Sequence, residues 1–285
     1  MEAIRKLKEE ILKEYPRLDK DSKFTFSCHP GVSCFNACCA DVNIFLTPYD
    51  ILRMKQALKM TSGEFLKKYT IMPFDEKIKY PIVQLQMQDN EKKSCHFVGE
   101  QGCGIYQDRP WACRMYPLGL ASPKEGNKEL DDEFYFLLNE GVCKGHCEKK
   151  EQTVGSWVED QGIREYNDMG EEFKDLTLHK FFLEGQNLDP RKVEMFFMAC
   201  YHLDKFREFV FNSSFLDKFE IDVETQEKVR TDDMALLRLG YRWLRFALFG
   251  EKTLSVKGEV MEKKKEELDK KNEALKKKKL PPSKN

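Results

Sequence analysis

Four of the ten cysteines in this 285-residue chain lie in the short stretch CHPGVSCFNACC, residues 28–39, and the last two are adjacent. Thiolates gathered this closely repel one another, and a soft or borderline cation is the usual compensation. Nine of the ten cysteines fall between Cys28 and Cys147. A single cysteine is most often a small buried hydrophobic residue, but nine in one segment predict a metal-binding domain.

The spacing of these cysteines separates them into three groups. Four thiolates in a tetrahedral arrangement suit either zinc or an iron–sulfur cluster. The sequence contains no CxxC pair, and ligands from separated segments indicate a site that only the folded chain assembles. Successive side chains of an extended backbone point to opposite sides, so Cys38 and Cys39 would serve two metal centres more easily than one. The groups are Cys28, Cys34, Cys38 and Cys39; Cys95, Cys103 and Cys113; and Cys143 and Cys147.

Whether clustered cysteines bind metal or form disulfides depends on the cellular compartment. The N-terminal stretch MEAIRKLKEEILKEYP lacks the apolar core of a signal peptide, and no later run approaches the roughly 18 apolar residues of a membrane span. We therefore expect a cytoplasmic protein with reduced thiols and no membrane span, which disfavours a secreted disulfide scaffold.

The distribution of charge bears on partners. The net charge is −1, with a mildly acidic body and a basic segment over residues 251–285. This is far from the strong basic patch of a dedicated nucleic-acid binder. The sequence predicts a protein or small-molecule partner without identifying it, and gives no support for nucleic acid.

Local patterns predict short helices and strands through the first half. Thr47 is the expected N-cap of a helix, with Pro48 in its first position and Asp50 completing a capping box. Thr61 and Glu64 predict a second capping box.

Two further stretches of this half read as strands and turns. The alternation in YPIVQLQMQ predicts a half-buried strand with Val83, Leu85 and Met87 inward, and residues 133–138 suggest another strand. Cys95 and Cys103 flank the turn GEQG as ligands on a hairpin would.

From Thr153 onward the pattern is helical. A helix is expected to begin at Thr153, a second at Asp189 with Pro190 in its first position, and a third within DDMALLRLGYRWLRFALFG. Their apolar stripes predict core positions rather than cofactor contacts. The predicted stripes are Val193, Phe196, Phe197, Cys200 and Leu203 on the second helix, and Leu236, Leu239, Trp243 and Ala247 on the third.

Together these patterns predict an α+β protein in which a small cysteine-cluster domain of short antiparallel strands and helices packs on a helical C-terminal half. We expect an N-terminal helix over residues 1–19, a cysteine-cluster metal-binding domain over 20–150 and a helical domain over 151–250. Residues 251–285 are expected to form a charged helical or disordered tail, whose removal after Gly250 would leave the fold intact.

Four blocks of the sequence resemble the YkgJ family of cysteine-cluster proteins, also described as a zinc- or iron-chelating domain. They are FSCHPGVSCFNACC, IFLTPYDILRMKQAL, CHFVGEQGCGIYQDRPWACRMYPLG and CKGHCEKKEQTVGSWVEDQGI, which together span roughly half the chain. Flagellin N-methylases resemble the same domain, so the resemblance does not fix one reaction. It implies that the metal ligands are Cys28, Cys34, Cys38, Cys39, Cys95, Cys103, Cys113 and Cys143, and leaves out Cys147 and Cys200.

Arg109 and Arg114 flank Cys113 and are predicted to contact the cofactor. Four thiolates around zinc or around an oxidised four-iron cluster carry net negative charge, which a guanidinium would offset while donating to sulfur. The alternative is that Arg109 pairs with Asp108 or a loop carbonyl. His29 and His96 each follow a cysteine and could supply a ring nitrogen, or lie exposed beside the ligand loop.

The preferred function is a cytoplasmic iron–sulfur protein, with one or two clusters of the 4Fe-4S type and a redox or cluster-supported enzymatic role. The alternative is a zinc-binding structural or adaptor protein with no catalysis. No phosphate loop, dinucleotide fingerprint or Ser-His-Asp order is visible in the sequence, so no catalytic residue is assigned and nucleotide-dependent chemistry is unsupported.

Overall fold

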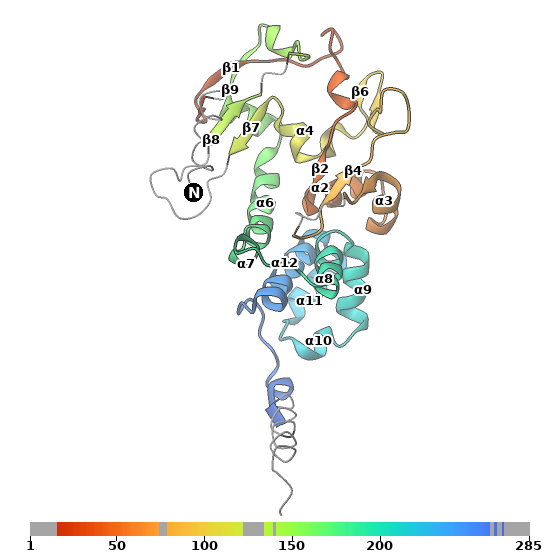
Figure 1. Cartoon of the computed structure of the whole chain (residues 1–285), viewed down its shortest axis with the longest axis vertical. Helices are drawn as coiled ribbons and strands as arrows, with labels where there is room; N and C mark the ends of the chain where they lie inside the picture. Colours follow the sequence, from red (N-terminus) through yellow and green to blue (C-terminus); the bar gives the residue numbers. More distant parts are fainter. Residues whose placement is uncertain are drawn as a thin grey trace, which may run out of the picture. The chain divides into compact units, whose positions relative to one another are not determined.

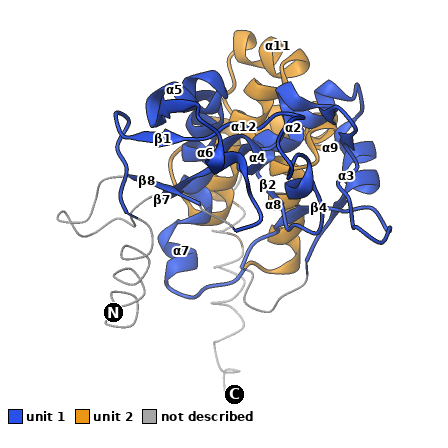
Figure 2. Cartoon of the chain, turned by 90° about the horizontal axis from the view of Figure 1, so that it is seen from above, with its two compact units in different colours: residues 1–187 blue, residues 188–285 orange. Residues whose placement is uncertain are grey.

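The computed structural model describes residues 16–73, 79–121, 134–138, 141–262, 265–266 and 270. The chain forms two compact units, residues 1–187 and residues 188–285 (Figure 1, Figure 2). The first, the cysteine unit, combines short antiparallel strands with helices, and the second, the helical unit, is built of helices. The predicted α+β class is confirmed. Most of the expected N-terminal helix lies outside the described residues.

A pair of strands closes the cysteine-rich segment at its two ends. Strand β1 (Lys23–Thr25) pairs antiparallel with β9 (Glu151–Thr153), with Phe24 opposite Gln152. The backbone N–H of Phe26 continues this pairing by donating to the carbonyl of Lys150 over 3.0 Å. Because Cys28 to Cys147 all lie between these strands, the segment begins and ends at one place.

A three-stranded antiparallel sheet lies further along the unit. Its order is β2 (Phe45–Leu46), β4 (Val83–Leu85) and β3 (Thr70–Ile71). Val83 and Leu85 are 0% and 2% exposed, which confirms the predicted inward positions on β4. Met87 is part-buried beyond the strand and forms an isolated bridge with Cys95.

Both predicted capping boxes are present. Helix α2 (Pro48–Ala57) begins after Thr47, whose Oγ1 accepts from the backbone N–H of Asp50 over 3.1 Å. Helix α3 (Ser62–Tyr69) begins after Thr61, whose Oγ1 accepts from the N–H of Glu64 over 3.2 Å. A side-chain acceptor satisfies an N–H that would otherwise lack a partner at a helix start.

The remaining short elements of the cysteine unit carry or border the thiols. The predicted GEQG turn joins β5 (Val98–Gly99) to β6 (Gly102–Cys103), and the strand expected at residues 133–138 is β8 (Phe134–Leu137), paired with β7 (Leu118–Ala121). The others are the 3-10 helices η1 (Ala37–Cys39), η2 (Tyr106–Asp108) and η3 (Gly145–Cys147) and the short helix α4 (Trp111–Met115).

An aromatic and aliphatic core supports this unit. Phe24 and Phe26 pack edge-on against Trp157, with ring centroids 6.1 and 5.5 Å apart, and the Trp157 indole N–H donates to the carbonyl of Met115 over 3.3 Å. Cys143 packs against the same cluster. The core therefore ties the closing strands to α4 and to the Cys143 segment.

The predicted helix beginning at Thr153 is divided in two. Helix α5 (Val154–Asp160) ends before Gly162, which has φ of +61°, and α6 (Ile163–Thr177) follows it. Glycine adopts this left-handed conformation without steric cost, so the chain turns there. The short helix α7 (Lys180–Leu183) completes the unit.

The helical unit contains α8 (Pro190–Cys200), α9 (Leu203–Asn212), α10 (Phe215–Lys218), α11 (Val223–Thr231) and α12 (Asp233–Phe249). Asp189 caps α8 as predicted, accepting from the N–H of Lys192 over 3.0 Å. Trp243 packs against Phe206 with ring centroids 5.5 Å apart. The core of this unit is therefore aromatic.

Most residues of the predicted stripes are buried, with three exceptions. Phe196, Cys200, Leu203, Leu236, Leu239 and Trp243 are buried as expected. Leu203, however, begins α9 rather than continuing the helix that starts at Pro190, because α8 ends at Cys200. Val193, however, is 36% exposed, because it lies in the first turn of α8, before the buried part of the helix begins at Phe196. Phe197 and Ala247 are only partly buried.

The start of the expected C-terminal tail packs against the helical unit. Leu254 is 6% exposed. The N–H of Glu220 donates to the carbonyl of Ser255, and that of Lys257 to the carbonyl of Lys218, each over 2.9 Å. The expectation that this segment buries little is therefore wrong, because cutting after Gly250 would remove a buried side chain and two backbone partners. Residues 271–285 lie outside the described part of the chain.

Candidate metal centre

The β5–β6 hairpin carries two of the predicted ligands. Cys103 lies opposite Val98 in the hairpin, and Cys95 precedes β5. The backbone N–H groups of Phe97 and Val98 hydrogen-bond the Cys95 thiol, and that of Ile105 bonds the Cys103 thiol. Hydrogen bonds of this kind stabilise a thiolate and so oppose the effect of burial, which raises the pKa of both groups.

Cys39 and Cys113 lie near Cys95 and Cys103. The N–H of Cys95 donates to the carbonyl of Cys39 over 2.7 Å, and Ala40 bridges Ser94 next to it. Cys113 comes from α4, where burial first, then the nearby charges of Cys95, Asp50 and Cys103, raise the pKa of its thiol to about 12. The side chain of Cys113 keeps exposed surface. We call Cys39, Cys95, Cys103 and Cys113 the hairpin set.

A second group forms where the first cysteine loop meets the Cys143 segment. The N–H of Lys144 donates to Sγ of Cys34 over 3.0 Å, and the N–H of Ser27 donates to the carbonyl of Gly145 over 3.1 Å. Burial first, then the charges of Cys38, Cys34 and Cys143, raise the pKa of Cys28 to about 11. We call Cys28, Cys34, Cys38 and Cys143 the loop set.

The approach of the two segments in the loop set depends on a glycine. A Cβ atom on Gly145 would lie 2.8 Å from the carbonyl oxygen of Ser27 and 2.6 Å from the ring of Phe26. Real Cβ atoms do not come this close to backbone oxygen, so the position has no room for a side chain.

Cys38 and Cys39 lie where the two sets adjoin. They form the end of η1, a 3-10 helix, in which successive side chains are about 120° apart rather than opposite. A hydrogen bond with Cys38 is the largest cause that raises the pKa of Cys39, followed by burial and the charge of Cys38. The assumption of an extended backbone at this pair is therefore wrong, although side chains about 120° apart still point in different directions.

The chemistry of the donors fits a group held by thiolates. Each set offers four thiols, and backbone N–H groups already donate to three of the eight sulfurs. Across the described residues, no three His, Cys, Asp or Glu side chains converge closely enough to hold a metal ion. Each set is thus a gathering of thiols rather than a formed coordination shell.

Arg109 is a buried cation beside both sets. It is 7% exposed, its Nη1 donates to the carbonyl of Tyr106 over 3.0 Å, and its guanidinium carbon lies 3.6 Å from the centre of the Tyr106 ring. Its charge opposes the rise in pKa at Cys28 in the loop set and at Cys103 and Cys113 in the hairpin set. Arg109 thus bonds a loop carbonyl, as the alternative expected, and also acts on the thiols.

Arg114 is committed to the backbone. Its Nε donates to the carbonyl of Arg109 over 3.0 Å, its Nη1 to that of Gln161 over 2.5 Å, and its Nη2 to that of Gln107. These bonds brace the loop between the hairpin and α4. A contact between Arg114 and a cofactor stays a prediction.

Asp50 has a second role that its capping box did not reveal. The side chain is 1% exposed; Oδ2 accepts from the N–H and hydroxyl of Thr47, at 2.7 and 2.8 Å, and Oδ1 accepts from the N–H of Trp111 over 2.7 Å. One carboxylate therefore holds the starts of both α2 and α4, the helix that carries Cys113. Burial raises its pKa to about 6 against these hydrogen bonds.

Arg53 ties the same region to α6. Its Nε and Nη2 contact Asp108 Oδ1 at 3.0 and 2.7 Å, and its Nη1 contacts Glu165 at 3.0 Å and the Tyr49 hydroxyl at 3.1 Å. Asp108 thus pairs with Arg53. Arg109 instead donates to the carbonyls of Tyr106 and Cys113 and to the side-chain oxygen of Gln161. Nothing in the local sequence around Arg53 signals this clamp.

The other candidate residues lie apart from the sets or beside them. Cys147 is exposed in η3, and Cys200 is fully buried in the helical unit. The Nδ1 atom of His29 accepts from the N–H of Gly31 over 3.1 Å, and its Nε2 lies 3.4 Å from Glu148. His96 packs on the ring of Tyr69 with centroids 5.4 Å apart.

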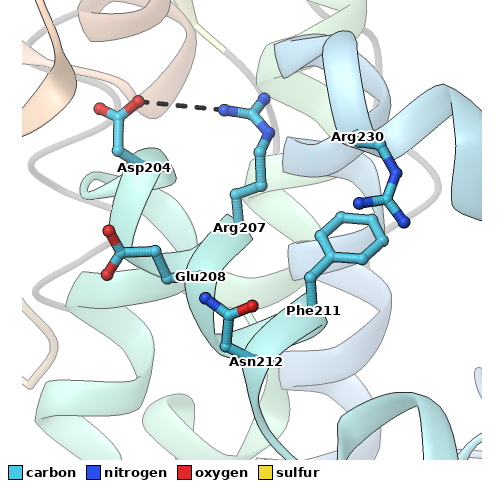
Figure 3. Close-up of a pocket in the computed structure, with 6 residues that line it drawn as sticks. All are labelled: Asp204, Arg207, Glu208, Phe211, Asn212 and Arg230. Atoms are coloured by element: carbon cyan, nitrogen blue, oxygen red, sulfur yellow. Dashed lines mark ion pairs between the residues drawn. The ribbon is translucent and has the colours of Figure 1, made fainter.

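The helical unit has a shallow cavity of about 340 Å³ between α9 and α11 (Figure 3). Arg230 stacks on Phe211, with its guanidinium carbon 4.1 Å from the ring centre. Arg207 pairs with Asp233 at 2.5 Å and with Asp204 at 3.9 Å. Carboxylates and guanidinium groups are mixed around the cavity, and no cysteine lines it.

A comparison with protein-family models matches the cysteine-rich segment. Residues 27–152 match the family model CxxCxxCC, described as a "putative zinc- or iron-chelating domain". No curated protein and no solved structure matches the chain. The match runs from the end of β1 into β9 and includes all nine clustered cysteines, and it supports metal binding by this segment. The narrower resemblance to the YkgJ family stays a prediction.

No helix in the described ranges combines the length and the apolar character that a bilayer crossing requires.

Proposed function

We propose that the cysteine unit binds one or two iron–sulfur clusters of the 4Fe-4S type through the eight cysteines of the loop and hairpin sets, and serves a redox or cluster-supported enzymatic role. The observation that carries this proposal is the gathering of these thiols, from segments far apart in the sequence, into two adjoining sets of four. Four cysteine ligands are what one 4Fe-4S cluster requires.

The surroundings of the sulfurs favour a redox group over zinc. Reduction potentials of iron–sulfur clusters depend on net charge and on hydrogen bonds to sulfur. The N–H groups of Lys144, Phe97, Val98 and Ile105 supply such hydrogen bonds, and Arg109 supplies a buried positive charge. Zinc is redox-inert, so in a zinc site these features would only offset the charge of the thiolates.

The chain's own residues would hold and adjust the cluster. The eight thiolates bind it, and the amide donors and Arg109 offset their negative charge. Arg114 and Asp50 act indirectly, by fixing the backbone around Cys113. A bound cluster supplies a one-electron couple, for which the partner would be an electron-carrying protein or a small molecule, in a cytoplasmic setting.

The second candidate is a zinc-binding structural or adaptor protein. It is favoured by the family description, which names zinc beside iron, and by the suitability of four thiolates for a tetrahedral zinc site. In this case the metal would stabilise the fold and carry out no chemistry.

Anaerobic reconstitution separates the two candidates. Protein incubated with iron and sulfide, then desalted, is expected to show a visible absorption band that dithionite bleaches, together with a paramagnetic signal in the reduced state. Cys200→Ala is the matched control, since it removes a thiol of the helical unit and should give the same spectra. Protein that takes up no sulfide, yet binds zinc, would favour the adaptor.

A further inference from the structure

Cys38 and Cys39 are neighbours in the sequence but belong to different surroundings. The carbonyl of Cys39 accepts from the N–H of Cys95 over 2.7 Å, which places this residue on the hairpin side. The N–H of Ala37, the residue before Cys38, donates to the carbonyl of Cys34 over 2.9 Å, which holds the turn that carries Cys38 beside the Cys34 loop.

The backbone connections within each set support the same division. On one side, Lys144 bonds Sγ of Cys34 and Ser27 bonds Gly145, which joins the Cys28, Cys34 and Cys143 segments. On the other side, Val98 pairs with Cys103 and Cys95 bonds Cys39, which joins the hairpin to the end of η1. Among the described residues, the backbone–backbone bonds between thiol-bearing segments stay within one set or the other. One side-chain bond, from Asn36 Nδ2 to the carbonyl of Gly99 over 2.9 Å, links the first cysteine loop to the hairpin.

The number of thiols in each set matches the requirement of a closed thiolate site. Zinc takes four ligands in structural sites, and a 4Fe-4S cluster takes four cysteines. Eight thiols around one centre would leave four without a role, whereas two sets of four use all of them.

We infer that the cysteine unit holds two separate four-thiolate metal centres, divided at the Cys38–Cys39 peptide bond: one bound by Cys28, Cys34, Cys38 and Cys143, the other by Cys39, Cys95, Cys103 and Cys113. This inference rests on the proposed metal function and adds the number of centres and the ligands of each. Because one peptide bond joins the two centres and Arg109 acts on thiols of both, the charge of one centre bears on the other.

The first test is a reciprocal pair of variants, Cys143→Ser and Cys95→Ser, in the full-length chain. Each should retain about half of the wild-type metal per chain, because it removes one ligand from one set and none from the other. Cys147→Ser is the control from the same segment and should keep the full content. A variant of either set that loses all metal while its circular dichroism stays native, or one that keeps all of it, would overturn the division.

The second test needs no variant and so does not depend on whether one folds. Wild-type protein is loaded with Zn²⁺ to half its capacity and alkylated, the half-loaded species is isolated by mass, and the labelled cysteines are mapped by tandem mass spectrometry. Molecules in which one complete set is labelled and the other is protected are the expected result. Labels scattered over both sets, or the absence of a half-loaded species, would contradict the inference.

Failure of the proposed metal function can be distinguished from failure of the division into two centres. If the protein binds neither zinc nor reconstituted iron and sulfide, the proposed function falls and the inference falls with it. If metal binds but only as a single centre, the inference alone is wrong.

Discussion

The backbone amide of Lys144 donates a 3.0 Å hydrogen bond to Sγ of Cys34, joining the Cys143 segment to the first cysteine loop. Alongside it, the carbonyl of Gly145 accepts from Ser27. The loop set thus depends on a backbone contact between two segments at opposite ends of the cysteine-rich region.

This contact predicts a strong effect of Gly145→Ala. The added Cβ would meet the carbonyl of Ser27 at 2.8 Å, so the two segments must separate. We expect weaker metal binding at the loop set and a loss of about 1–3 kcal/mol of stability, as for overpacking in a core. Gly141→Ala is the matched control, because no atom lies within 4 Å of its added Cβ. Metal titration and thermal melts that do not distinguish the two variants would contradict the described contact.

Arg109 is expected to set the reduction potential of a bound cluster. Removing its charge in Arg109→Gln should lower the potential, because the positive charge favours the reduced and more negative state. At an effective dielectric constant of about 20, a unit charge about 10 Å away contributes on the order of 1–2 kcal/mol, or tens of millivolts. Arg109→Lys keeps the charge and should shift the potential less. Redox titration followed by visible absorption measures both, and a higher potential in Arg109→Gln would argue against this role.

Asp50 predicts a pH dependence of folding stability. Its pKa is raised from 3.8 to about 6 in the folded protein, so the native state holds a proton that the unfolded chain releases. The stability that this group contributes is therefore fully present below pH 3.8 and is lost as the pH rises through 6. Each unit of pKa difference corresponds to about 1.4 kcal/mol, so the total loss is about 3 kcal/mol.

The comparison of wild type with Asp50→Asn isolates this effect. The amide does not titrate, and it offers one acceptor oxygen where Asp50 uses two, so the variant also loses a cap at every pH. Denaturant unfolding between pH 4 and 7, at equal metal content, should show the advantage of the wild type shrinking as pH rises. An advantage that grows with pH would mean that burial does not dominate the Asp50 environment.

Because the beginning of the C-terminal tail packs on the helical unit, we expect two truncated chains to differ in melting temperature. Ending the chain after Gly250 removes Leu254 and the partners of Glu220 and Lys218, whereas ending it after Gly258 keeps them. Burial of a leucine contributes about 1.5–3 kcal/mol, so the shorter chain should melt at a clearly lower temperature. Circular dichroism melts of the two truncations measure this. Equal melting temperatures would show that the Ser255 segment adds no stability.

Local signals allowed several elements to be predicted from the sequence. The caps at Thr47, Thr61 and Asp189 and the hairpin around GEQG depend on residues within a few positions of one another, and all are present. The exposure of Val193 and the break in the helix at Gly162 were not predicted. A periodic apolar stripe does not reveal at which residue a helix enters the core or where the chain turns.

The candidate site was predictable in composition but not in arrangement. Clustered thiols are visible in the sequence, whereas the pairing of Cys95 with Cys39 and the second bond of Asp50 to Trp111 join segments far apart in the chain. Such contacts depend on the whole fold. The division of the thiols into two sets therefore required the structure.

The measurement that bears most directly on the proposed function is the iron, acid-labile sulfide and zinc content of protein purified without air. Air exposure can strip iron and admit zinc, so the preparation must stay anaerobic. With both sets loaded, we expect about eight iron ions and eight sulfide ions per chain, little zinc, and a brown colour that dithionite bleaches. Protein that carries about two zinc ions, no sulfide and no reducible species after anaerobic purification would contradict it.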